Sequence, residues 1–576
     1  MLPYLVRRLL ENGANSSFVN RFLDEDVPVD ELVTDVLSVV RGYEDVTHPS
    51  IPLPQALYQQ HGEARSNSIG PDLDDERDLA SILAAVIEPG HTPALSDTGE
   101  DLIVLSPADV NLQAGKWRPA SAASIEAAFV AAEAAQWSWD HAGGNARAQV
   151  LDHVADLMEQ HLPELVALLA IEAGRTLDDG VAEVREAVDF ARYYAQEARS
   201  HFTKPLVLPG PTGEVNRLSL HGRGVFACIS PWNFPLAIFT GQISAALAAG
   251  NSVLAKPAEQ TPLIAARVVE LFTAAGLPEG LLHLLPGSGA TVGHKLVSDP
   301  RIAGVAFTGS IQTAWTINQA LAARVGPIVP LIAETGGQNA MIVDSTALPE
   351  QVVDDVVASA FKSAGQRCSA LRVLYLQEDI ADPVITMLKG AMAELKIGLP
   401  WRADVDIGPI IDVTALKRLQ VHAEKFASRT LAVCDLPKGL TGHFFAPRML
   451  TLHSIAELEG EVFGPVLHVI RFSAEQIETV IDQINATGYG LTLGVHTRID
   501  RFAKHLFERV RVGNVYVNRN MVGAVVGVNP FGGEGLSGTG PKAGGPRYLL
   551  RFATERTWTD NRVAQGGNTD LFRLNR

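Results

Sequence analysis

The spacing of apolar and polar residues divides the chain into regions of different character. From about residue 101, long stretches repeat apolar residues at intervals of three and four, as an amphipathic helix does; examples are "SIEAAFVAAEAAQWSW" and "VLDHVADLMEQHLPELVALLAIEAG". The second stretch ends at Gly174, which we expect to cap the carboxyl end of its helix. The pattern predicts a helix-rich region before residue 215.

From residue 215 onward the pattern changes to short apolar runs that alternate with helical segments, including "GVFACIS", "NSVLAKP", "GVAFTG", "NAMIV" and "NVYVN". This alternation is typical of parallel sheets covered by helices on both faces, so the fold class is α/β. Residues 225–255 carry no charge, which raises the question of a membrane span. Two prolines and an asparagine in "SPWNFP" favour strand, loop, helix and strand instead.

The first hundred residues differ from the rest. Residues 1–47 have a helical period, and the stretch after them, "THPSIPLPQALYQQHGEARSNSIGPD", is rich in Pro, Ser, Gly and Asn, which predicts a linker over 48–100. The first residues lack the apolar core of a secretory signal.

Length and composition narrow the possible functions. A chain of 576 residues exceeds one hydrophobic core, so we expect sub-domains with a cleft between them. The net charge of -18, with no basic patch, argues against nucleic acid and anionic lipid as partners. Three cysteines without a C-x-x-C pair form neither a disulfide framework nor a thiolate metal site, so we expect no metal and a reducing, cytoplasmic location.

One of the three cysteines has a polar setting. Cys228 and Cys434 lie in apolar runs and are expected to be buried and inert. Cys368 lies in "SAGQRCSALR", where the guanidinium of Arg367 or a helix start would favour the thiolate. By itself this context leaves open whether Cys368 is a nucleophile or a thiol near a turn.

Other polar residues follow strand-like runs. Glu334, in "LIAETGGQNA", stands where a carboxylate can act as a base, and Asn233 is held between two prolines, as a rigid oxyanion donor must be. Lys256 and Glu259, in "LAKPAEQTP", suit the hydroxyls of a ribose, although a solvated charge pair is the simpler explanation.

Two glycine-rich segments could approach a phosphate. "PGSGATVG" (286–293) nearly matches G-x-G-x-x-G, but its last spacing is one residue too long, and "FTGS" (307–310) ends a strand before a helical stretch. Either segment could equally be an ordinary turn.

Taken together, these segments resemble the aldehyde dehydrogenase superfamily. The motifs "PWNFP", "KPAEQTP", "FTGS", "ETGGQNA", "GQRCSA", "EVFGPV" and "PFGGEGLSGTG" occur in the family's order, and the resemblance runs from about residue 100 to the end. It implies a Rossmann-like NAD-binding domain, an α/β catalytic domain and a β-hairpin oligomerisation flap. It also implies that Cys368 is the nucleophile, Glu334 the general base and Asn233 the oxyanion donor.

The same resemblance implies a site for NAD. Its residues in this sequence would be Ile229, Trp232, Lys256, Glu259, Gly289, Gly309, Ser310, Glu461 and Phe463. A carboxylate at position 259 would repel a 2′-phosphate, so NAD is expected rather than NADP.

The segments 520–546 and 551–572 resemble the C-terminal half of the bifunctional proline utilisation A family, whose aldehyde dehydrogenase part oxidises L-glutamate γ-semialdehyde, formed from 1-pyrroline-5-carboxylate. The resemblance places the substrate at Ser369, Gly523, Ala524 and Phe531. For Ser369 a helix-capping hydroxyl is the alternative. Tyr4, Arg7 and Arg8 would share one side of a helix like the last helix of a proline dehydrogenase barrel.

These resemblances divide the chain. Residues 1–47 would be a remnant of the proline dehydrogenase domain, with Met1 an artificial start, no flavin and no proline oxidation. Residues 101–333 would bind NAD, with a flap strand near 214–222, residues 334–528 would carry catalysis, and residues 529–576 would complete the flap of a homodimer. The remaining alternatives are an enzyme for another small aldehyde, a catalytically silent module of the same fold, and a cysteine-dependent acyl hydrolase.

Overall fold

The computed structural model describes residues 18–24, 27–33, 35–43, 51, 53–87, 101–211 and 213–561. The chain divides into two compact units, residues 1–67 and 68–576. In the first unit the structure has short helices and two 3₁₀ turns: α2 (Phe18–Leu23), α3 (Val29–Leu32), α4 (Val36–Arg41), η1 (Pro54–Ala56) and η2 (Gln59–His61). Tyr4, Arg7 and Arg8 lie outside the described residues.

The second unit begins within the segment expected to be a linker. Residues Glu76–Ile87 of that segment form helix α5. Leu79, Ile82 and Leu83 share one face of this helix because they are three and four residues apart, and Ile82 is 1% exposed in the core beneath it. Hydrophobic burial has therefore folded part of the expected linker.

A layer of long helices follows strands β1 (Leu102–Leu105) and β2 (Gln113–Trp117). It consists of α6 (Ala122–His141), α7 (Gly143–Gln160), α8 (Leu162–Ala173) and α9 (Leu177–Phe202). The longer of the two predicted stretches is two helices, because Pro163 fits the first turn of a new helix and not the interior of one. Gly174 has a φ of 68° and caps α8, as the sequence predicts.

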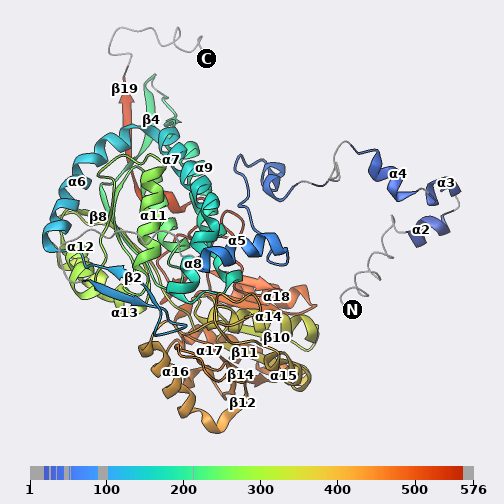
Figure 1. Ribbon diagram of the computed structural model, residues 1–576. Coiled ribbons are helices and arrows are strands. Elements are labelled where there is room, and N and C mark those ends of the chain that lie inside the picture. Colours follow the sequence, from blue (N-terminus) through green and yellow to red (C-terminus); the bar gives the residue numbers. More distant parts are fainter. Residues whose placement is uncertain are drawn as a thin grey trace. The chain divides into compact units, whose positions relative to one another are not determined.

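The helical layer packs against a parallel sheet. Among the described residues its five strands lie in the order β7 (Leu282–Leu284), β6 (Ser252–Lys256), β5 (Val225–Ile229), β8 (Ile302–Thr308) and β9 (Leu331–Glu334). The connecting helices are α10 (Ala237–Ala248), α11 (Pro262–Ala274), α12 (His294–Ser298) and α13 (Ile311–Ala323). Helices α7 to α11 pack on one face of this sheet, and α6 packs on the other with α12 and α13. Figure 1 shows α7, α9 and α11 together, with α6 apart from them.

The uncharged run 225–255 forms strand β5, a loop, helix α10 and strand β6, as predicted. Across the described ranges, the structure has no helix that is both long enough and apolar enough to cross a membrane.

A second, larger sheet carries the other half of the unit. In the part of the chain that the structure describes, its seven strands are β12 (Thr430–Val433), β13 (Arg448–Thr451), β14 (Val466–Phe472), β11 (Val373–Gln377), β10 (Ala340–Val343), β16 (Thr492–His496) and β17 (Asn514–Val517), in that order. Only the β12–β13 pair is antiparallel. Its helices are α14 (Pro349–Phe361), α15 (Glu378–Ala393), α16 (Val413–Lys425), α17 (Ile477–Ala486) and α18 (Asp500–Arg509).

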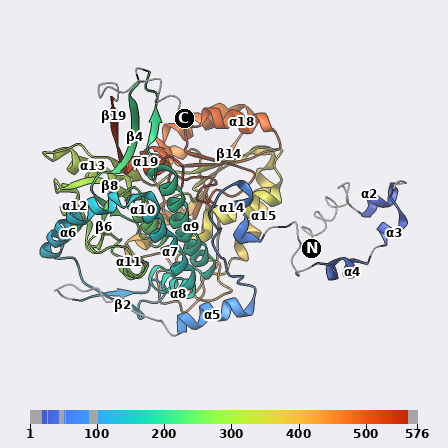
Figure 2. The same ribbon diagram turned by 90° about the horizontal axis from the view of Figure 1, so that it is seen from above.

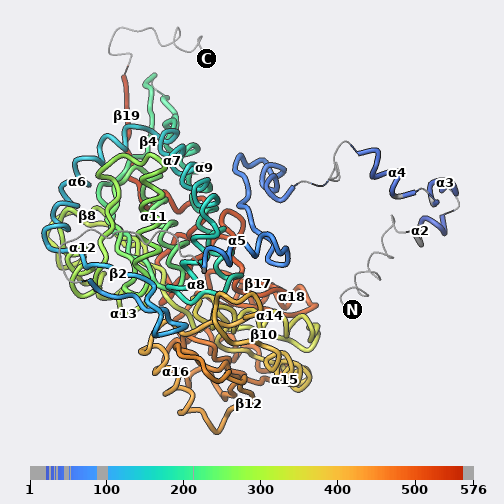
Figure 3. Tube along the Cα trace, viewed as in Figure 1, coloured from blue at the N-terminus to red at the C-terminus, as the bar shows by residue number. Residues whose placement is uncertain are grey.

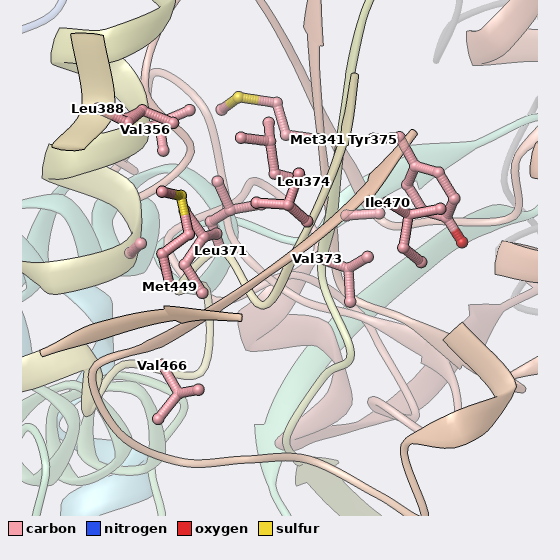
Figure 4. Close-up of a cluster of buried hydrophobic side chains, with 14 of the residues drawn as sticks. Met341, Val356, Leu371, Val373, Leu374, Tyr375, Leu388, Met449, Val466 and Ile470 are labelled. Carbon is pink, nitrogen blue, oxygen red and sulfur yellow. The ribbon is translucent and has the colours of Figure 1, made fainter. Parts of the chain in front are cut away.

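The core of the larger sheet consists of side chains from several strands and helices. Figure 4 shows Leu374 and Met341 from the sheet near Val356 and Leu388 from α14 and α15, all of them completely buried. Cys434 belongs to this core and Cys228 to the core under the smaller sheet, as predicted. Burial raises the pKa of both thiols, to about 11 for Cys434, so neither is a ready nucleophile.

A third sheet joins distant parts of the chain. Strand β4 (Val215–Gly222) pairs antiparallel with β3 (Leu206–Leu208) on one side and with β19 (Ala553–Asp560) on the other. Figures 1 and 2 both show β4 and β19 side by side, and Figure 3 traces the late residues of β19 back to this early strand. The remaining elements are β15 (Tyr489–Gly490), β18 (Glu534–Gly535) and α19 (Tyr548–Arg551).

Candidate active site

The predicted site residues follow the carboxyl ends of neighbouring parallel strands. Asn233 comes after β5, Lys256 ends β6, Gly309 and Ser310 follow β8, and Glu334 ends β9. Because these strands are adjacent in the sheet, their ends meet at one edge, which is where open α/β sheets bind ligands.

The loop that holds Cys368 has an unusual backbone. Ser363, Ala364 and Gly365 have φ values of 55°, 53° and 64°, so three successive residues are left-handed. A Cβ atom at residue 365 would lie 2.3 Å from the carbonyl oxygen of Gly464, which makes glycine necessary there. This turn ends α14 and brings Cys368 to the site ahead of β11.

Asn233 meets the Cys368 loop directly. Its Nδ2 donates a hydrogen bond to the carbonyl oxygen of Gln366 at 3.2 Å, and its side chain is buried. On the other side of the loop, Asn339 Nδ2 donates to the carbonyl oxygen of Cys368 at 2.6 Å. The two amides fix the loop to both sheets.

Cys368 lies in the wall between two cavities. A cavity of about 650 Å³ is lined by Trp232, Asn233, Gly309, Ser310, Cys368, Glu461 and Phe463. A second cavity, of about 110 Å³, is lined by Glu334, Cys368, Ser369, Ala524 and Phe531. Both cavities share Cys368, Thr308 and Thr335 in their walls, so groups from two ligands could reach the same sulfur atom.

Glu334 faces the smaller cavity with one oxygen bound and one free of protein partners. Its Oε2 accepts a hydrogen bond from the backbone N–H of Gly533 at 3.0 Å, and Oε1 is buried with no partner among the described residues. Burial raises the pKa of Glu334 to about 8, against a weaker opposing effect of the Gly533 N–H. A carboxyl group with such a pKa can exchange a proton near neutral pH.

Arg367 does not favour the Cys368 thiolate, contrary to the expectation from the sequence. Its Nη2 donates to Asp179 Oδ1 at 2.6 Å and its Nε to Ser363 Oγ at 2.8 Å, so its charge is paired elsewhere. Burial raises the pKa of Cys368 to about 12, and the carboxylates of Glu461 and Glu334 add to the rise. The resting sulfur is therefore a thiol.

The residues expected at the adenosine ribose lie near one another beside the sheet edge. Gly289 N–H donates to Glu259 Oε1 at 3.2 Å, and Lys256 Nζ donates to the carbonyl oxygens of Pro257 and Gly287, both at 2.8 Å. Burial lowers the pKa of Lys256 to about 8. These three residues and Ile229, which is buried in β5, do not line the larger cavity.

Gly309 and Ser310 form the start of helix α13. Ser310 Oγ accepts a hydrogen bond from Thr313 N–H at 3.2 Å and caps the helix, while Gly309 N–H donates to the carbonyl oxygen of Glu334. The remaining free N–H groups of the first turn suit an anionic group at the cavity wall.

Glu461 and Phe463 are held by Arg372, a residue that the sequence reasoning missed. Arg372 is 1% exposed; its Nη2 lies 3.3 Å from Glu461 Oε1, and its guanidinium lies 5.1 Å from the Phe463 ring centre. It also donates to the carbonyl oxygens of Gly365 and Arg367, on the Cys368 loop. The sequence feature that could have pointed to Arg372 is its position four residues after Cys368.

Three of the four residues predicted to bind the substrate line the smaller cavity, and one does not. Ser369, Ala524 and Phe531 line the smaller cavity, but Gly523 does not; its carbonyl oxygen accepts from Arg519 Nη2 at 3.1 Å. Strand β11 rather than a helix follows Ser369, so a capping role has no support. The sequence reasoning missed other lining residues, namely Glu186, Phe190, Tyr194, Phe234, Gln242 and Tyr548.

Cys368 lies between two cavities, and one of them is bordered by the amino end of a helix that follows a parallel strand. This arrangement is typical of an oxidoreductase that takes an organic substrate and a nucleotide. Residues 95–559 match the model of the Aldehyde dehydrogenase family, and the chain belongs to that family.

Two curated relatives refine this comparison. The chain is 50% identical over 581 residues to the Bifunctional protein PutA of Klebsiella aerogenes, covering 96% of this chain and 43% of that protein. It is 36% identical over 467 residues to 1-pyrroline-5-carboxylate dehydrogenase of Anoxybacillus flavithermus, covering 80% of this chain and 90% of that one. The chain thus spans less than half the length of the bifunctional relative.

A solved structure agrees with the second relative. The structure titled 1-pyrroline-5-carboxylate dehydrogenase from Thermus with bound NAD matches with a TM-score of 0.81 and 34% identity, over 86% of this chain and 99% of that one.

Proposed function

We propose that this chain oxidises L-glutamate γ-semialdehyde, which forms from 1-pyrroline-5-carboxylate, to L-glutamate with NAD. The observation that carries the proposal is the position of Cys368 between two cavities of different size and lining. The names of the two relatives and of the NAD-bound structure support the choice of substrate and cofactor.

The larger cavity offers groups for part of NAD, and the loop after β6 offers one for the rest. In the cavity, the α13 start at Ser310 offers N–H groups for the pyrophosphate and Glu461 a carboxylate for the nicotinamide ribose. Outside the cavity, Glu259 offers a carboxylate for the adenosine ribose. Trp232 and Phe463, with ring centres 5.4 Å apart, offer aromatic surfaces for the nicotinamide ring. When bound, NAD supplies the hydride acceptor of the reaction.

The Cys368 thiol gives its proton to the Glu334 carboxylate, which lines the same cavity, and the sulfur adds to the aldehyde carbonyl to form a thiohemiacetal. Glu334 passes this proton to solvent before the hydrolysis step. Asn233 Nδ2 and the backbone N–H of Cys368 stabilise the oxyanion, since preorganised donors cost little reorganisation as charge develops. The Gln366 loop contact holds Asn233 Nδ2 beside the nucleophile. Loss of hydride leaves a thioester on Cys368.

Glu334 then acts as the general base for hydrolysis of the thioester. Its unpartnered Oε1 can accept a proton from water as the water attacks the carbonyl carbon, and Cys368 leaves. A pKa of about 8 places this carboxyl group close to the pH at which such a proton transfer is effective.

The far end of the substrate carries an ammonium and a carboxylate. Ser369 and Ala524 line the smaller cavity, and with the N–H of nearby Gly523 they would bind the carboxylate; Phe531 would contact the aliphatic chain.

The test measures NAD reduction by absorbance with L-glutamate γ-semialdehyde and with propanal. We expect a preference for the semialdehyde that Ser369→Ala reduces by about tenfold while propanal turnover stays unchanged. Cys368→Ala should abolish both activities. An equal or greater preference for propanal would contradict the proposed substrate, and ester hydrolysis without NAD would indicate an acyl hydrolase.

We also propose that two subunits pair through the β3, β4 and β19 sheet, in which β19 leaves one edge unpaired among the described strands. Coupling to a proline dehydrogenase domain is proposed from the name of the bifunctional relative. A reducing, cytoplasmic location is proposed from the three free cysteines.

A further inference from the structure

Two helices next to the site lack a cap of their own. Helix α10 begins after Leu236 and helix α11 after Thr261, and neither of these side chains accepts a hydrogen bond from its own helix. Both starts are buried, so the free backbone N–H groups of their first turns need acceptors from elsewhere.

Two glutamates from the long-helix layer supply these acceptors. Glu183 of α9 accepts through Oε1 from the N–H groups of Leu236 at 2.9 Å and Ala237 at 3.3 Å. Glu172 of α8 accepts through Oε1 from Leu263 N–H at 2.7 Å and through Oε2 from Ile264 N–H at 2.9 Å. Each glutamate is 1% exposed. Negative charge at a helix amino end is favourable.

Each capped helix directly follows a loop of the candidate site. Asn233 lies three residues before Leu236, on the loop between β5 and α10. Glu259 lies four residues before Leu263, on the loop between β6 and α11. The sheet fixes one end of each loop, and a glutamate fixes the helix start at the other end.

We propose that Glu183 positions Asn233 and that Glu172 positions the Lys256–Glu259 loop, each through the backbone of the helix it caps. Figure 2 shows α8, α9, α10 and α11 in one group of helices, and α9 packs on α10 as α8 packs on α11. The inference rests on the proposed roles of Asn233 and Glu259. Glu183 would then control the position of the oxyanion donor, and Glu172 would control the position of the cofactor-binding loop.

The surroundings of the two carboxylates differ. Glu183 Oε2 lies 3.4 Å from Arg175 Nε, so that pair forms a buried charge pair. Glu172 has no ion-pair partner within the described ranges, and burial raises its pKa to about 8. Substituting Glu183 alone would remove the direct ion-pair partner of the buried Arg175 charge, on which Asp179 and Glu186 also act favourably, whereas substituting Glu172 removes only the cap.

The experiment compares leucine, which removes the acceptor, with glutamine, which keeps one, at each position of the full chain. Glu183→Leu should lower kcat by about tenfold and leave the Kd of NAD within about twofold of wild type. Glu172→Leu should raise the Kd of NAD by about tenfold and leave kcat at saturating NAD within about twofold. Each glutamine variant keeps one accepting oxygen, so Glu183→Gln should lower kcat less than Glu183→Leu, and Glu172→Gln should raise the Kd of NAD less than Glu172→Leu.

A double-mutant cycle separates positioning from general damage. In an Asn233→Ala background, Glu183→Leu should lower kcat no further, because the group that it positions is already gone. In the same background Glu172→Leu should still raise the Kd of NAD by its full factor.

If Glu183→Leu does not fold, an Arg175→Met background removes the buried charge. There, Glu183→Leu and Glu183→Gln differ only in the cap, and the leucine variant should again have the lower kcat.

Equal changes of kcat and Kd in both leucine variants, or a further loss of kcat when Glu183→Leu is added to Asn233→Ala, would overturn the inference. If wild type shows no NAD-dependent oxidation, the proposed function fails and the inference fails with it. If wild type is active but Glu183→Leu and Glu172→Leu both change kcat and the Kd of NAD to the same extent, only the inference fails.

Discussion

Burial sets the chemistry of the individual site residues. Cys368 and Glu334 share a cavity wall, and for both of them burial disfavours the charged form, which raises the pKa to about 12 and about 8 respectively. A thiol that is not ionised at rest is protected from adventitious reaction, and it needs a base when it attacks. The environment therefore links the reactivity of the sulfur to the ionisation of the carboxyl group.

The pH dependence of turnover follows from Glu334. A general base works when it is ionised, so the rate of thioester hydrolysis should rise with pH through about 8 and then level off. Steady-state rates between pH 6 and pH 10 measure this. Glu334→Gln should lower kcat by about 100-fold and remove the rise; a rise that persists in Glu334→Gln would assign it to another group. Binding of NAD serves as the control and should not change.

Cofactor preference should depend on Glu259. A carboxylate there would repel a 2′-phosphate, so Glu259→Ser should raise kcat/KM for NADP relative to NAD by about tenfold or more. The ratio of the two values is measured with one aldehyde at fixed ionic strength. Glu279→Ser, a change of the same charge elsewhere on the chain, should leave the ratio unaltered. An unchanged ratio in Glu259→Ser would contradict the assigned role.

At the scale of elements, the left-handed turn before Cys368 combines local strain with close packing. Ser363 and Ala364 adopt positive φ without being glycine, and Gly365 packs against the Gly464 carbonyl group. The surrounding structure must hold this turn in place, because each such non-glycine residue costs about 1 kcal/mol or more.

Substitutions in this turn should have opposite effects on stability. Gly365→Ala adds a Cβ atom 2.3 Å from the Gly464 oxygen, so the free energy of unfolding should fall by about 3 kcal/mol or more. Ala364→Gly removes the unfavourable φ and should be neutral or slightly stabilising. Urea unfolding of both variants measures this. Equal stability of the two variants would mean that the turn relaxes without cost.

The sequence predicted elements best where one local signal dominates. Gly174 ends α8 because a left-handed cap favours glycine, and the uncharged run 225–255 divides at its prolines as expected. Helix α5 was missed because the Pro- and Gly-rich residues before it masked a short apolar face. The orientation of Arg367 could not be predicted, because its partner Asp179 lies on another helix far away in the sequence.

For the whole molecule, the sequence predicted parallel sheets from the apolar runs. It predicted neither their strand order nor the antiparallel strand β12, because both depend on long-range packing. The family resemblance of their motifs predicted that Asn233, Glu334 and Cys368 gather, and in the structure Asn233 and Glu334 each line a cavity that Cys368 also lines. Arg372 and the two capping glutamates were missed, because a buried charge is recognised only once its partners are known.

Assembly should depend on the exposed edge strand. Trp558 of β19 is 64% exposed, and an exposed aromatic residue on an edge strand is typical of an interface. Trp558→Glu should weaken subunit association by about 100-fold while kcat per subunit is retained. Sedimentation velocity over a concentration series measures the strength of subunit association. Phe507→Glu, a similarly exposed site on α18, is the matched control. Unaltered association in Trp558→Glu would place the interface elsewhere.

The wall that Cys368 shares between the two cavities also has a pharmacological consequence. A molecule with a nicotinamide-like head, an electrophilic carbon and an amino-acid tail would occupy both cavities at once and present its carbon to the sulfur between them. Such a bridging compound would gain selectivity from the combination, since a competing protein would have to offer both cavities at the same separation to bind it as tightly.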